Sequence, residues 1–366
     1  MEATVCRPPE LGTAELERWR SLQLAAPSLR HPFLSGEFAQ AVGSVSRRAR
    51  VAVVEDGADA VGFFAFDQHA MGAARPLAAR LTYRQAFVHE PGLVWSWAEI
   101  ARAARLPIIE FSGLTGEQAR DLAADELVPS PIIDTSGGWD GYLADARRRR
   151  RIKNTMYLAR KLEREVAPLE LRHTPMHSSE FSHLVAWKSQ QYRRSGWPDP
   201  FARRWVRDLL DLLAGGPRGL LEPVLSTLHA GDELVAADLS LVFDGVWAGW
   251  FSAYNPAFSS YSPGAICMLR TIEQACTDGI AYIDLAHGDE TYKRSFKNAF
   301  LEVGTGRVES TSPRAIAYRA ACAPGRATRS YILSRPRVRS FVRSSLRRVG
   351  SARIAATGVF FGGGLQ

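Results

Sequence analysis

Lysine is scarce in this chain. Only five of its 46 basic residues are lysines, and these are Lys153, Lys161, Lys188, Lys293 and Lys297. So many arginines, in a chain rich in alanine, are typical of a genome biased toward Arg and Ala codons. A single arginine is therefore weak evidence for a site, whereas a lysine is more informative.

Other absences exclude whole classes of protein. The four cysteines show no CxxC spacing, and the eight histidines form no HExxH pair, so we expect reduced thiols and no metal site. No stretch approaches the roughly 18 apolar residues that span a bilayer. The first residues lack the basic-then-apolar order of a signal peptide. These absences predict a cytoplasmic protein without a metal.

Acidic residues are missing from the C-terminal region. From Arg314 onward there are eleven arginines and no Asp or Glu, while the preceding residues carry 35 basic and 38 acidic groups. The net charge of +8 therefore belongs to the end of the chain, and the body is almost neutral. With 366 residues, the length predicts two packed units followed by this basic extension.

The basic extension has helical apolar spacing, at Val338, Phe341, Val342, Leu346 and Val349. One interpretation is a terminal helix packed on the body with a charged outer face. Arginines beside Phe and Leu also suit the surface of an anionic membrane, which would make the protein peripheral to the inner membrane. Contact with RNA is a third alternative.

The first half alternates apolar strands with helices. Residues 31–44 have a helical apolar face, and residues 49–56 and 60–67 form a predicted hairpin. Residues 139–166 contain no proline and predict one long helix, with a basic run from Arg147 to Lys153 at its centre. That run is either a solvated midsection or a surface facing a groove or partner.

The second half contains a predicted three-stranded antiparallel meander. Residues 220–255 alternate in polarity and turn at Gly231 and at Asp244-Gly245. A helix follows at residues 263–279, then a strand at 280–286, a short helix near 290–300 and a last strand near 301–310. The fold class is therefore mixed α/β, with mostly antiparallel sheet flanked by helices.

The helix that follows the meander begins with features of an anion site. Ser262 suits the N-cap and Pro263 the first helical position, so the amides of Gly264 and its successors are expected to point outward unpaired. The pyrophosphate of a coenzyme A would bind there. Capped helix starts are common, so this feature alone does not identify a phosphate site.

Polar side chains gather where the strand at 280–286 ends. Asp284, His287, Asp289 and Glu290 lie at this end, and Tyr292, Lys293, Phe296 and Lys297 follow. On a helix, two of the five lysines share one face, beside these acids. The group indicates either an acid–base or anion-binding cleft, or a salt-bridged turn in which Tyr292 and Phe296 are buried.

As an ordered set, these motifs resemble the CelD, or cellulose-biosynthesis, type of bacterial acetyltransferase-like domain. That family is related to the FemAB peptidyltransferases and has the N-acetyltransferase fold. The resemblance covers roughly residues 30–310. It rests on Pro32-Phe33-Leu34, the arginine-rich helix, Ala253-Tyr254-Asn255-Pro256, Tyr261-Ser262-Pro263-Gly264, Gly279 with Asp284, and Gly288-Asp289-Glu290 with Tyr292-Lys293.

The resemblance implies two related halves: residues 1–137, and a catalytic half at residues 138–312, before the extension at 313–366. It implies transfer of an acyl group from a thioester, or of an aminoacyl group from tRNA, to an amine or hydroxyl. Asp284 or Glu290 would be the base, Tyr292 the acid, and Lys293 would stabilise negative charge. Ser262 and Gly264 would bind the donor phosphates, and the implied acceptor residues are Asp238, Tyr254, His287 and Lys297.

The donor stays open at this point. The helix start SSYSPG is not the Arg/Gln-x-x-Gly-x-Gly/Ala loop of ordinary acetyl-CoA enzymes. The leading hypothesis is acyl transfer, with acetyl-CoA as the first candidate donor, to a saccharide or envelope precursor. The alternatives are a FemAB-like transferase using aminoacyl-tRNA and a non-catalytic accessory protein of polysaccharide synthesis.

Overall fold

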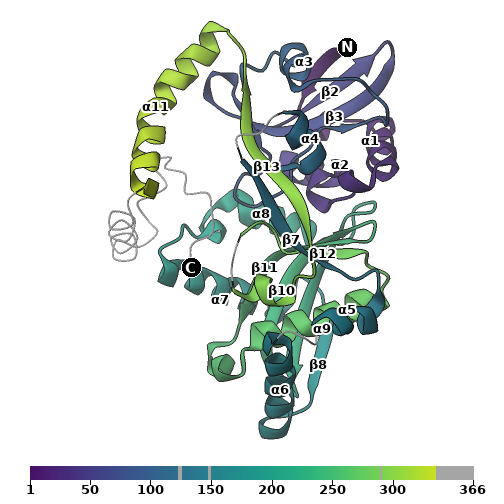
Figure 1. Cartoon of the computed structure of the whole chain (residues 1–366), viewed down its shortest axis with the longest axis vertical. Coiled ribbons are helices and arrows are strands. Elements are labelled where there is room, and N and C mark those ends of the chain that lie inside the picture. Colours follow the sequence, from purple (N-terminus) through teal and green to yellow (C-terminus); the bar gives the residue numbers. More distant parts are fainter. Residues whose placement is uncertain (123–125, 147–149, 289–290, 335–366) are drawn as a thin grey trace.

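A computed structural model describes residues 1–122, 126–146, 150–288 and 291–334. In these residues, two stretches of chain repeat one order of elements: a strand, two helices, three antiparallel strands, a helix, a strand, a helix and a strand (Figure 1). This repeat confirms the predicted mixed α/β fold. The predicted boundary after residue 137 precedes the helix that starts at Gly138, and it stays a prediction because one sheet runs through both halves.

The elements of the first half are β1 (Glu2–Cys6), α1 (Thr13–Ala25), α2 (Gly36–Val45), β2 (Ala49–Asp56), β3 (Asp59–Gln68), β4 (Ala74–Pro76), the additional short β5 (Val88–His89), α3 (Trp97–Ala103), β6 (Ile108–Thr115), α4 (Gly116–Asp121) and β7 (Glu126–Asp134). The helix expected at residues 31–44 is a 3-10 turn at Pro32–Leu34 followed by α2. The hairpin expected at 49–67 is β2 and β3.

Two helices, α5 (Gly138–Ala146) and α6 (Arg150–Glu165), join the halves. The elements of the second half are β8 (Leu169–Thr174), α7 (Ser179–Ser195), α8 (Arg204–Leu213), β9 (Glu222–Ala230), β10 (Glu233–Phe243), β11 (Val246–Tyr254), α9 (Pro263–Thr277), β12 (Tyr282–Asp284), α10 (Thr291–Phe296) and β13 (Ala299–Glu309). A single helix was expected at 139–166, but its centre, residues 147–149, lies outside the described residues, as do three of the six basic residues of the run from Arg147 to Lys153.

The two halves exchange their last strands. Within the described residues, the sheet runs in the order β1-β2-β3-β4-β6-β13-β7-β12-β11-β10-β9-β8. The last strand of the first half, β7, pairs with β12 of the second half, and β13 of the second half pairs with β6 of the first. Figure 1 shows β13 crossing the middle of the molecule from one half to the other. Backbone hydrogen bonds between β7 and β12, and between β13 and β6, therefore connect the two halves.

Helices cover both faces of this sheet. On one face, α1, α2, α7 and α8 cover a single apolar core that extends through both halves and contains Trp19, Phe38, Leu210 and Phe243. On the other face, α3 and α4 cover the first half, and α5, α6 and α9 cover the second. A fully buried side chain of this size contributes about 1.5–3 kcal/mol, so the shared core stabilises the arrangement of the halves.

The predicted meander is confirmed as β9, β10 and β11. Asp244 and Gly245 turn the chain with φ of 42° and 75°, the pair of positive values that a two-residue hairpin turn requires. Along β10, Leu239 and Leu241 enter the core under α7 and α8, while Ala236 and Val242 belong to clusters on the other face, which α9 covers. The helix expected at 263–279 is α9, and Pro263 is its first residue, as expected.

The C-terminal extension begins with α11 (Pro313–Ser334), which lies along one side of the molecule (Figure 1). Its first turns pack on the body, where Ala315 and Tyr318 are buried against Ala73 and Ile108. The Tyr318 hydroxyl donates to Glu110 at 2.9 Å. The spacing noted at residues 338–349 falls outside the described residues. Among the helices that the structure describes, none is long and apolar enough to cross a bilayer.

Candidate functional site

The candidate site lies where β11 and β12 diverge. The two strands pair in parallel over only three positions, from Val246 with Tyr282 to Ala248 with Asp284. Beyond Ala248, no strand in the described part of the chain pairs with β11 on this side. Among the described residues, this edge of β11 therefore lacks the strand partner that its first half has, which leaves room for a ligand to pair there.

A β-bulge marks the same position on the other edge of β11. The register with β10 shifts between Gly249, which faces Ser240, and Phe251, which faces Leu239. Trp250 is the extra residue, and its indole Nε1 donates to the carbonyl of Leu81 at 2.8 Å. Such bulges turn a strand locally, so β11 bends where it leaves β12.

Tyr83 of the first half bridges the two strands at this point. Its hydroxyl lies 3.0 Å from the carbonyl oxygen of Gly249 and 3.3 Å from that of Asp284, and its single proton is shared between them. Burial and the nearby Asp284 raise the pKa of Tyr83 well above its usual value, so the phenol stays a donor. The base of the divergence is thus held by a residue from the other half.

The Asp284 carboxylate is fully buried and bound by two side chains of the first half. Arg84 Nη2 lies 2.6 Å from its Oδ2, and His31 Nε2 lies 3.3 Å from the same oxygen. Burial alone would raise the pKa of Asp284, but Arg84 and His31 outweigh it and lower that pKa to about 2. Asp284 is therefore an ionised partner of Arg84 rather than an accessible proton acceptor.

His31 is neutral in this cluster. Its Nδ1 accepts from the backbone amide of Phe33 at 3.2 Å, which places the ring proton on Nε2, toward Asp284. Burial lowers the pKa of His31, although Asp284 opposes that shift. The cluster therefore holds one positive and one negative charge, those of Arg84 and Asp284.

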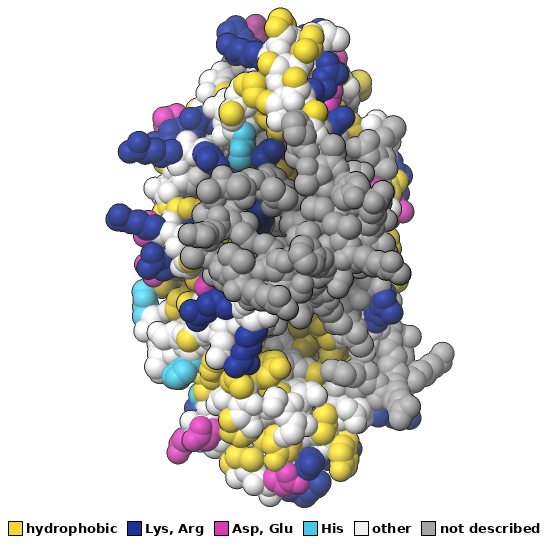
Figure 2. Space-filling model, turned by 90° about the vertical axis from the view of Figure 1, so that its left-hand side faces the viewer, with side chains coloured by type: hydrophobic (Ala, Val, Ile, Leu, Met, Phe, Trp, Pro, Cys, Tyr) yellow, Lys and Arg dark blue, Asp and Glu magenta, His cyan; other side chains and the backbone are white. Residues whose placement is uncertain are grey.

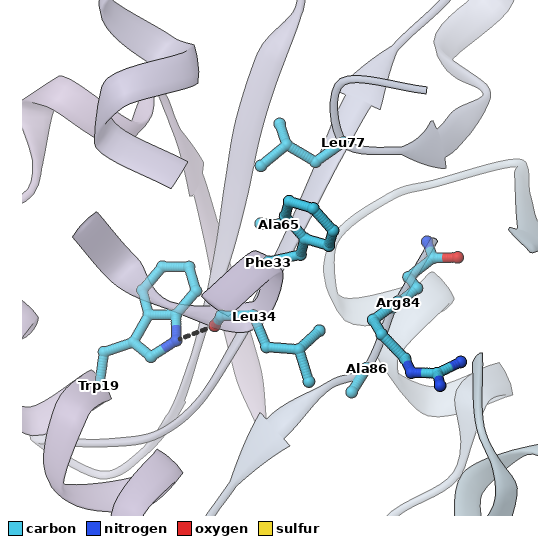
Figure 3. Close-up of a pocket in the computed structure, with 8 residues that line it drawn as sticks. Trp19, Phe33, Leu34, Ala65, Leu77, Arg84 and Ala86 are labelled. Carbon is cyan, nitrogen blue, oxygen red and sulfur yellow. Dashed lines mark hydrogen bonds between the residues drawn. The ribbon is translucent and has the colours of Figure 1, made fainter. Parts of the chain in front are cut away.

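Arg84 also lies at the edge of a small cavity in the first half. Its guanidinium points away from the apolar wall that Trp19, Phe33 and Leu77 form (Figure 3). The cavity offers about 10 Å³ to the centre of a water molecule, roughly enough for one water. It is too small for a substrate, so the cavity does not change the location of the candidate site.

A tight turn follows Asp284 and leads to α10. The amide of Ala286 donates to Asp284 Oδ1 at 2.8 Å, and Ala286 has a left-handed φ of 61°. Lys293, 4% exposed, donates through Nζ to the carbonyl of His287 at 3.1 Å and more weakly to that of Ala286. These two hydrogen bonds connect the turn at Ala286 and His287 to α10, which carries Lys293.

Tyr292 is 38% exposed, and its ring lies 6.0 Å from the Lys293 ammonium. The second interpretation of this segment expected both Tyr292 and Phe296 to be buried, and this holds for only one of them. Phe296 is fully buried, whereas Tyr292 reaches the surface. Lys297 lies over the ring of Phe300, 4.1 Å from its centroid. Glu290 and Asp289 lie outside the described residues.

The start of α9 differs from the expectation in one respect. Ser262 stands at the N-cap position, but its φ of 54° is left-handed and its side chain caps no amide. The amides of Ala265 and Ile266 both donate to the Ser262 carbonyl, so the expectation that they are unpaired is wrong. Gly264 remains open to a ligand, because a side chain there would meet only the ring of Tyr254, at 3.7 Å.

Asp238 lies apart from Asp284 and Tyr292. It stands on β10 opposite Ser252 of β11 and accepts from the Ser240 hydroxyl at 2.5 Å. Burial raises the pKa of Asp238 to about 6, despite this hydrogen bond and the charge of Lys188. Tyr254, 43% exposed, is two residues beyond Ser252 and lies beside the start of α9.

The structure thus brings together Asp284, His287, Tyr292 and Lys293, and separately Tyr254 with Gly264. Sequence reasoning missed His31, Tyr83 and Arg84. One signal was available for His31, which directly precedes the Pro32-Phe33-Leu34 motif. Arg84 is one of many arginines, and no motif or spacing in the sequence distinguishes it from the others. No group of three metal-ligating side chains occurs in the described residues.

Residues 146–294, less than half of the chain, match the family model described as Acetyltransferase (GNAT) domain. The matched segment includes β11, α9, β12 and the first four residues of α10, and so most of the candidate site. A search of curated proteins found no match.

Solved structures share the fold at low sequence identity. FemX is 12% identical with a TM-score of 0.54, and the alignment covers 84% of this chain and 96% of that one. The C-terminal domain of a putative lysylphosphatidylglycerol synthetase from Agrobacterium fabrum is 12% identical with a TM-score of 0.50, covering 85% and 96%. A tandem GNAT protein from the clavulanic acid biosynthesis pathway is 10% identical with a TM-score of 0.50, covering 85% and 99%.

The family match falls on the second half of the repeat, and the tandem GNAT protein has a fold similar to that of both halves together. The chain carries an acyltransferase domain of the GNAT type within a tandem GNAT-like fold.

Proposed function

We propose that the protein transfers an acyl group, acetyl first among candidates, from acyl-CoA to an amine or hydroxyl of a saccharide or envelope precursor. The observation that carries this proposal is the divergence of β11 from β12 beside the start of α9, inside the segment that matches the acetyltransferase domain. The CelD-type resemblance supports the choice of acceptor. The basic extension would place the enzyme on the cytoplasmic face of the membrane.

The donor would bind along the unpaired part of β11, with its pyrophosphate at Gly264 and beside Tyr254. A backbone amide of β11 beyond Ala248 would polarise the thioester carbonyl. The acceptor would attack this carbon, so that a bond to its nitrogen or oxygen forms while the C–S bond breaks. The acceptor loses its proton to a base, and the thiolate takes a proton from an acid.

The side chains fit these roles unequally. Tyr292 is exposed and is the proposed acid, and the buried ammonium of Lys293 brings a positive charge to the same end. The contacts of Asp284 favour an anchoring role for it, which leaves Glu290 as the proposed base. His287, whose carbonyl Lys293 binds, and Lys297, just after α10, are the proposed acceptor contacts at this end, with Asp238 on the β10 side.

The donor is tested at Gly264. An aspartate there favours the first turn of α9 but repels phosphate, whereas an asparagine has the same shape without the charge. We expect calorimetry to show acetyl-CoA binding that Gly264→Asp weakens at least about tenfold, or 1.4 kcal/mol, and that Gly264→Asn weakens much less. If wild type binds neither acetyl-CoA nor longer acyl-CoAs, the proposed donor is wrong.

The same experiment separates the alternatives. Binding of charged tRNA that falls steeply with salt would indicate the aminoacyl route instead. Binding of neither donor would indicate an accessory protein.

The proposed acid is tested by the release of free coenzyme A, with D-glucosamine as the acceptor. Tyr292→Phe removes only the hydroxyl, and we expect kcat to fall about 100-fold, since a positioned acid contributes about that much or more. Tyr157→Phe is the matched control, because Tyr157 is exposed on α6, outside the proposed site. An equal rate for both variants would remove Tyr292 from the mechanism.

A further inference from the structure

The first half has a divergence of its own, equivalent to that of β11 and β12, but its own chain fills it. There, β4 pairs in parallel with β6 at a single position, Ala74 with Ile109. Residues 77–89 then run between the diverging elements. The amide of Gln85 donates to Gly113 of β6 at 2.9 Å, and the carbonyl of Gln85 accepts from Thr115 at 3.0 Å.

The other edge of this inserted segment is also paired. Val88 and His89 form β5 and pair with Phe63 and Gly62 of β3. The side chain of Gln118 adds two hydrogen bonds to the backbone of Phe87, at 2.7 and 2.9 Å. The segment is therefore fixed to both of its neighbours, and the first half lacks the unpaired strand that the second half presents.

This fixed segment carries Tyr83 and Arg84 to the second half. Tyr83 bridges Gly249 and Asp284, and Arg84 pairs with Asp284 while also donating to Ser130 at 2.9 Å. Both side chains are buried, at 9% and 5% exposure. Neither reaches a position from which it could touch a substrate at the surface.

We propose that Arg84 is a positioning residue for acyl transfer, and that it acts through Asp284 on the turn that carries Tyr292 and Lys293. With Arg84 in place, Asp284 stays ionised and its Oδ1 accepts from Ala286. That contact supports the left-handed Ala286, a conformation that a residue other than glycine adopts at a cost. The same turn contains the carbonyls of Ala286 and His287, to which Lys293 donates.

The proposal rests on the proposed function for its kinetic effect, but its structural step can be measured without a donor. Hydrogen exchange at the amides of residues 285–288 reports directly on the turn. We expect Arg84→Met to accelerate this exchange at least about tenfold. Arg20→Met is the matched control, because Arg20 pairs with the buried Glu37 at 2.6 Å, far along the chain from the turn. It should leave exchange at 285–288 within about twofold of wild type.

Kinetics with acetyl-CoA and D-glucosamine then test the consequence. Arg84→Met should lower kcat at least about tenfold, with KM for acetyl-CoA within about threefold, while Arg20→Met leaves both unchanged. A buried Asp284 without Arg84 should also take up a proton near neutral pH, giving kcat a new dependence on pH. The second substitution in Arg84→Met/Asp284→Asn should abolish that dependence.

The outcomes are distinguishable. Unchanged exchange at 285–288 in Arg84→Met overturns the positioning role, whatever the activity. Faster exchange in an Arg84→Met protein, when wild type binds no acyl-CoA, supports the structural step and rejects the proposed function instead. If Arg84→Met does not fold, Arg84→Lys retains the charge and loses the planar guanidinium, and the same comparison applies.

Discussion

A side chain at Gly113 would collide with the backbone carbonyl of Tyr83. Gly113 lies in β6 with a φ of +81°, and Tyr83 belongs to the segment that crosses beside it on the way to the second half. The close approach of these two backbones sets the path of Tyr83 and Arg84. Glycine is therefore required at position 113 for two reasons: its backbone is left-handed, and there is no space for a side chain.

We predict that Gly113→Ala destabilises the protein by about 2–4 kcal/mol, adding the strain of a left-handed alanine to overpacking. Gly57→Ala is the matched control, since Gly57 has a φ of +65° but nothing within 4 Å of its added carbon. It should cost only about 1 kcal/mol. Urea unfolding measures both, and equal losses would show that the crossing at Tyr83 tolerates a side chain.

How much of this arrangement could be predicted from the sequence depends on the range of the interactions. The meander, Pro263 at the start of α9 and a strand within residues 280–286 follow from local periodicity and turn residues, and the structure confirms them, although β12 is shorter than expected, at Tyr282–Asp284. The contact of Arg84 with Asp284 joins positions 200 residues apart, and no local pattern encodes it. The exchange of β7 and β13 is likewise invisible, because strand periodicity does not name the partner strand.

Breaking the pair of Arg84 with Asp284 should be costly for folding. Arg84→Met leaves a buried carboxylate unpaired, and we predict a loss of about 3–5 kcal/mol in the free energy of unfolding at pH 7. Adding Asp284→Asn removes the charge and should restore about 1–2 kcal/mol. A double variant no more stable than Arg84→Met would show that the charge of Asp284 is not what destabilises it.

The pH dependence of this pair has a definite sign. Because the folded pKa of Asp284 is about 2, below its ordinary value of 3.8, its contribution is complete above pH 4 and is lost as the pH falls toward 2. In acid titrations of stability, the wild type should lose this contribution over that interval. Asp284→Asn should not show the same loss.

Asp238 should behave in the opposite way. Its folded pKa is raised to about 6, so the folded state holds its proton more tightly, and stability falls as the pH rises from 4 through 6. Asp238→Asn should therefore stabilise the protein by about 1–2 kcal/mol at pH 7 and have little effect at pH 4. Asp211→Asn is the matched control, because it makes the same substitution at an exposed position on α8. A stability gain that does not vary with pH would contradict the assignment.

One acyl donor should bind per chain, although the fold contains two halves. The hydrogen bonds of Gln85 to β6 close the first half, whereas β11 beyond Ala248 has no such partner in the described residues. Calorimetry with acetyl-CoA should therefore give a stoichiometry of one. Two equivalents would mean that the segment at residues 77–89 gives way to ligand.

The arginine-rich end of the chain should bind anionic membranes. Figure 2 shows the side on which α11 lies, where Lys and Arg side chains are more visible than Asp and Glu. Each arginine near an anionic surface contributes about 1 kcal/mol, and nine of the eleven arginines after residue 313 lie beyond Cys322. The full chain should sediment weakly with vesicles containing phosphatidylglycerol, less so at high salt, and not with phosphatidylcholine alone.

A truncation after Cys322 is the sharpest test, because it keeps Ala315 and Tyr318 in their contacts with the body. We expect the truncated protein to stay folded and to lose sedimentation with the anionic vesicles. The removed segment carries nine arginines and no Asp or Glu, so equal sedimentation of both proteins would place the membrane contact elsewhere, such as at the basic run from Arg147 to Lys153, or reject it.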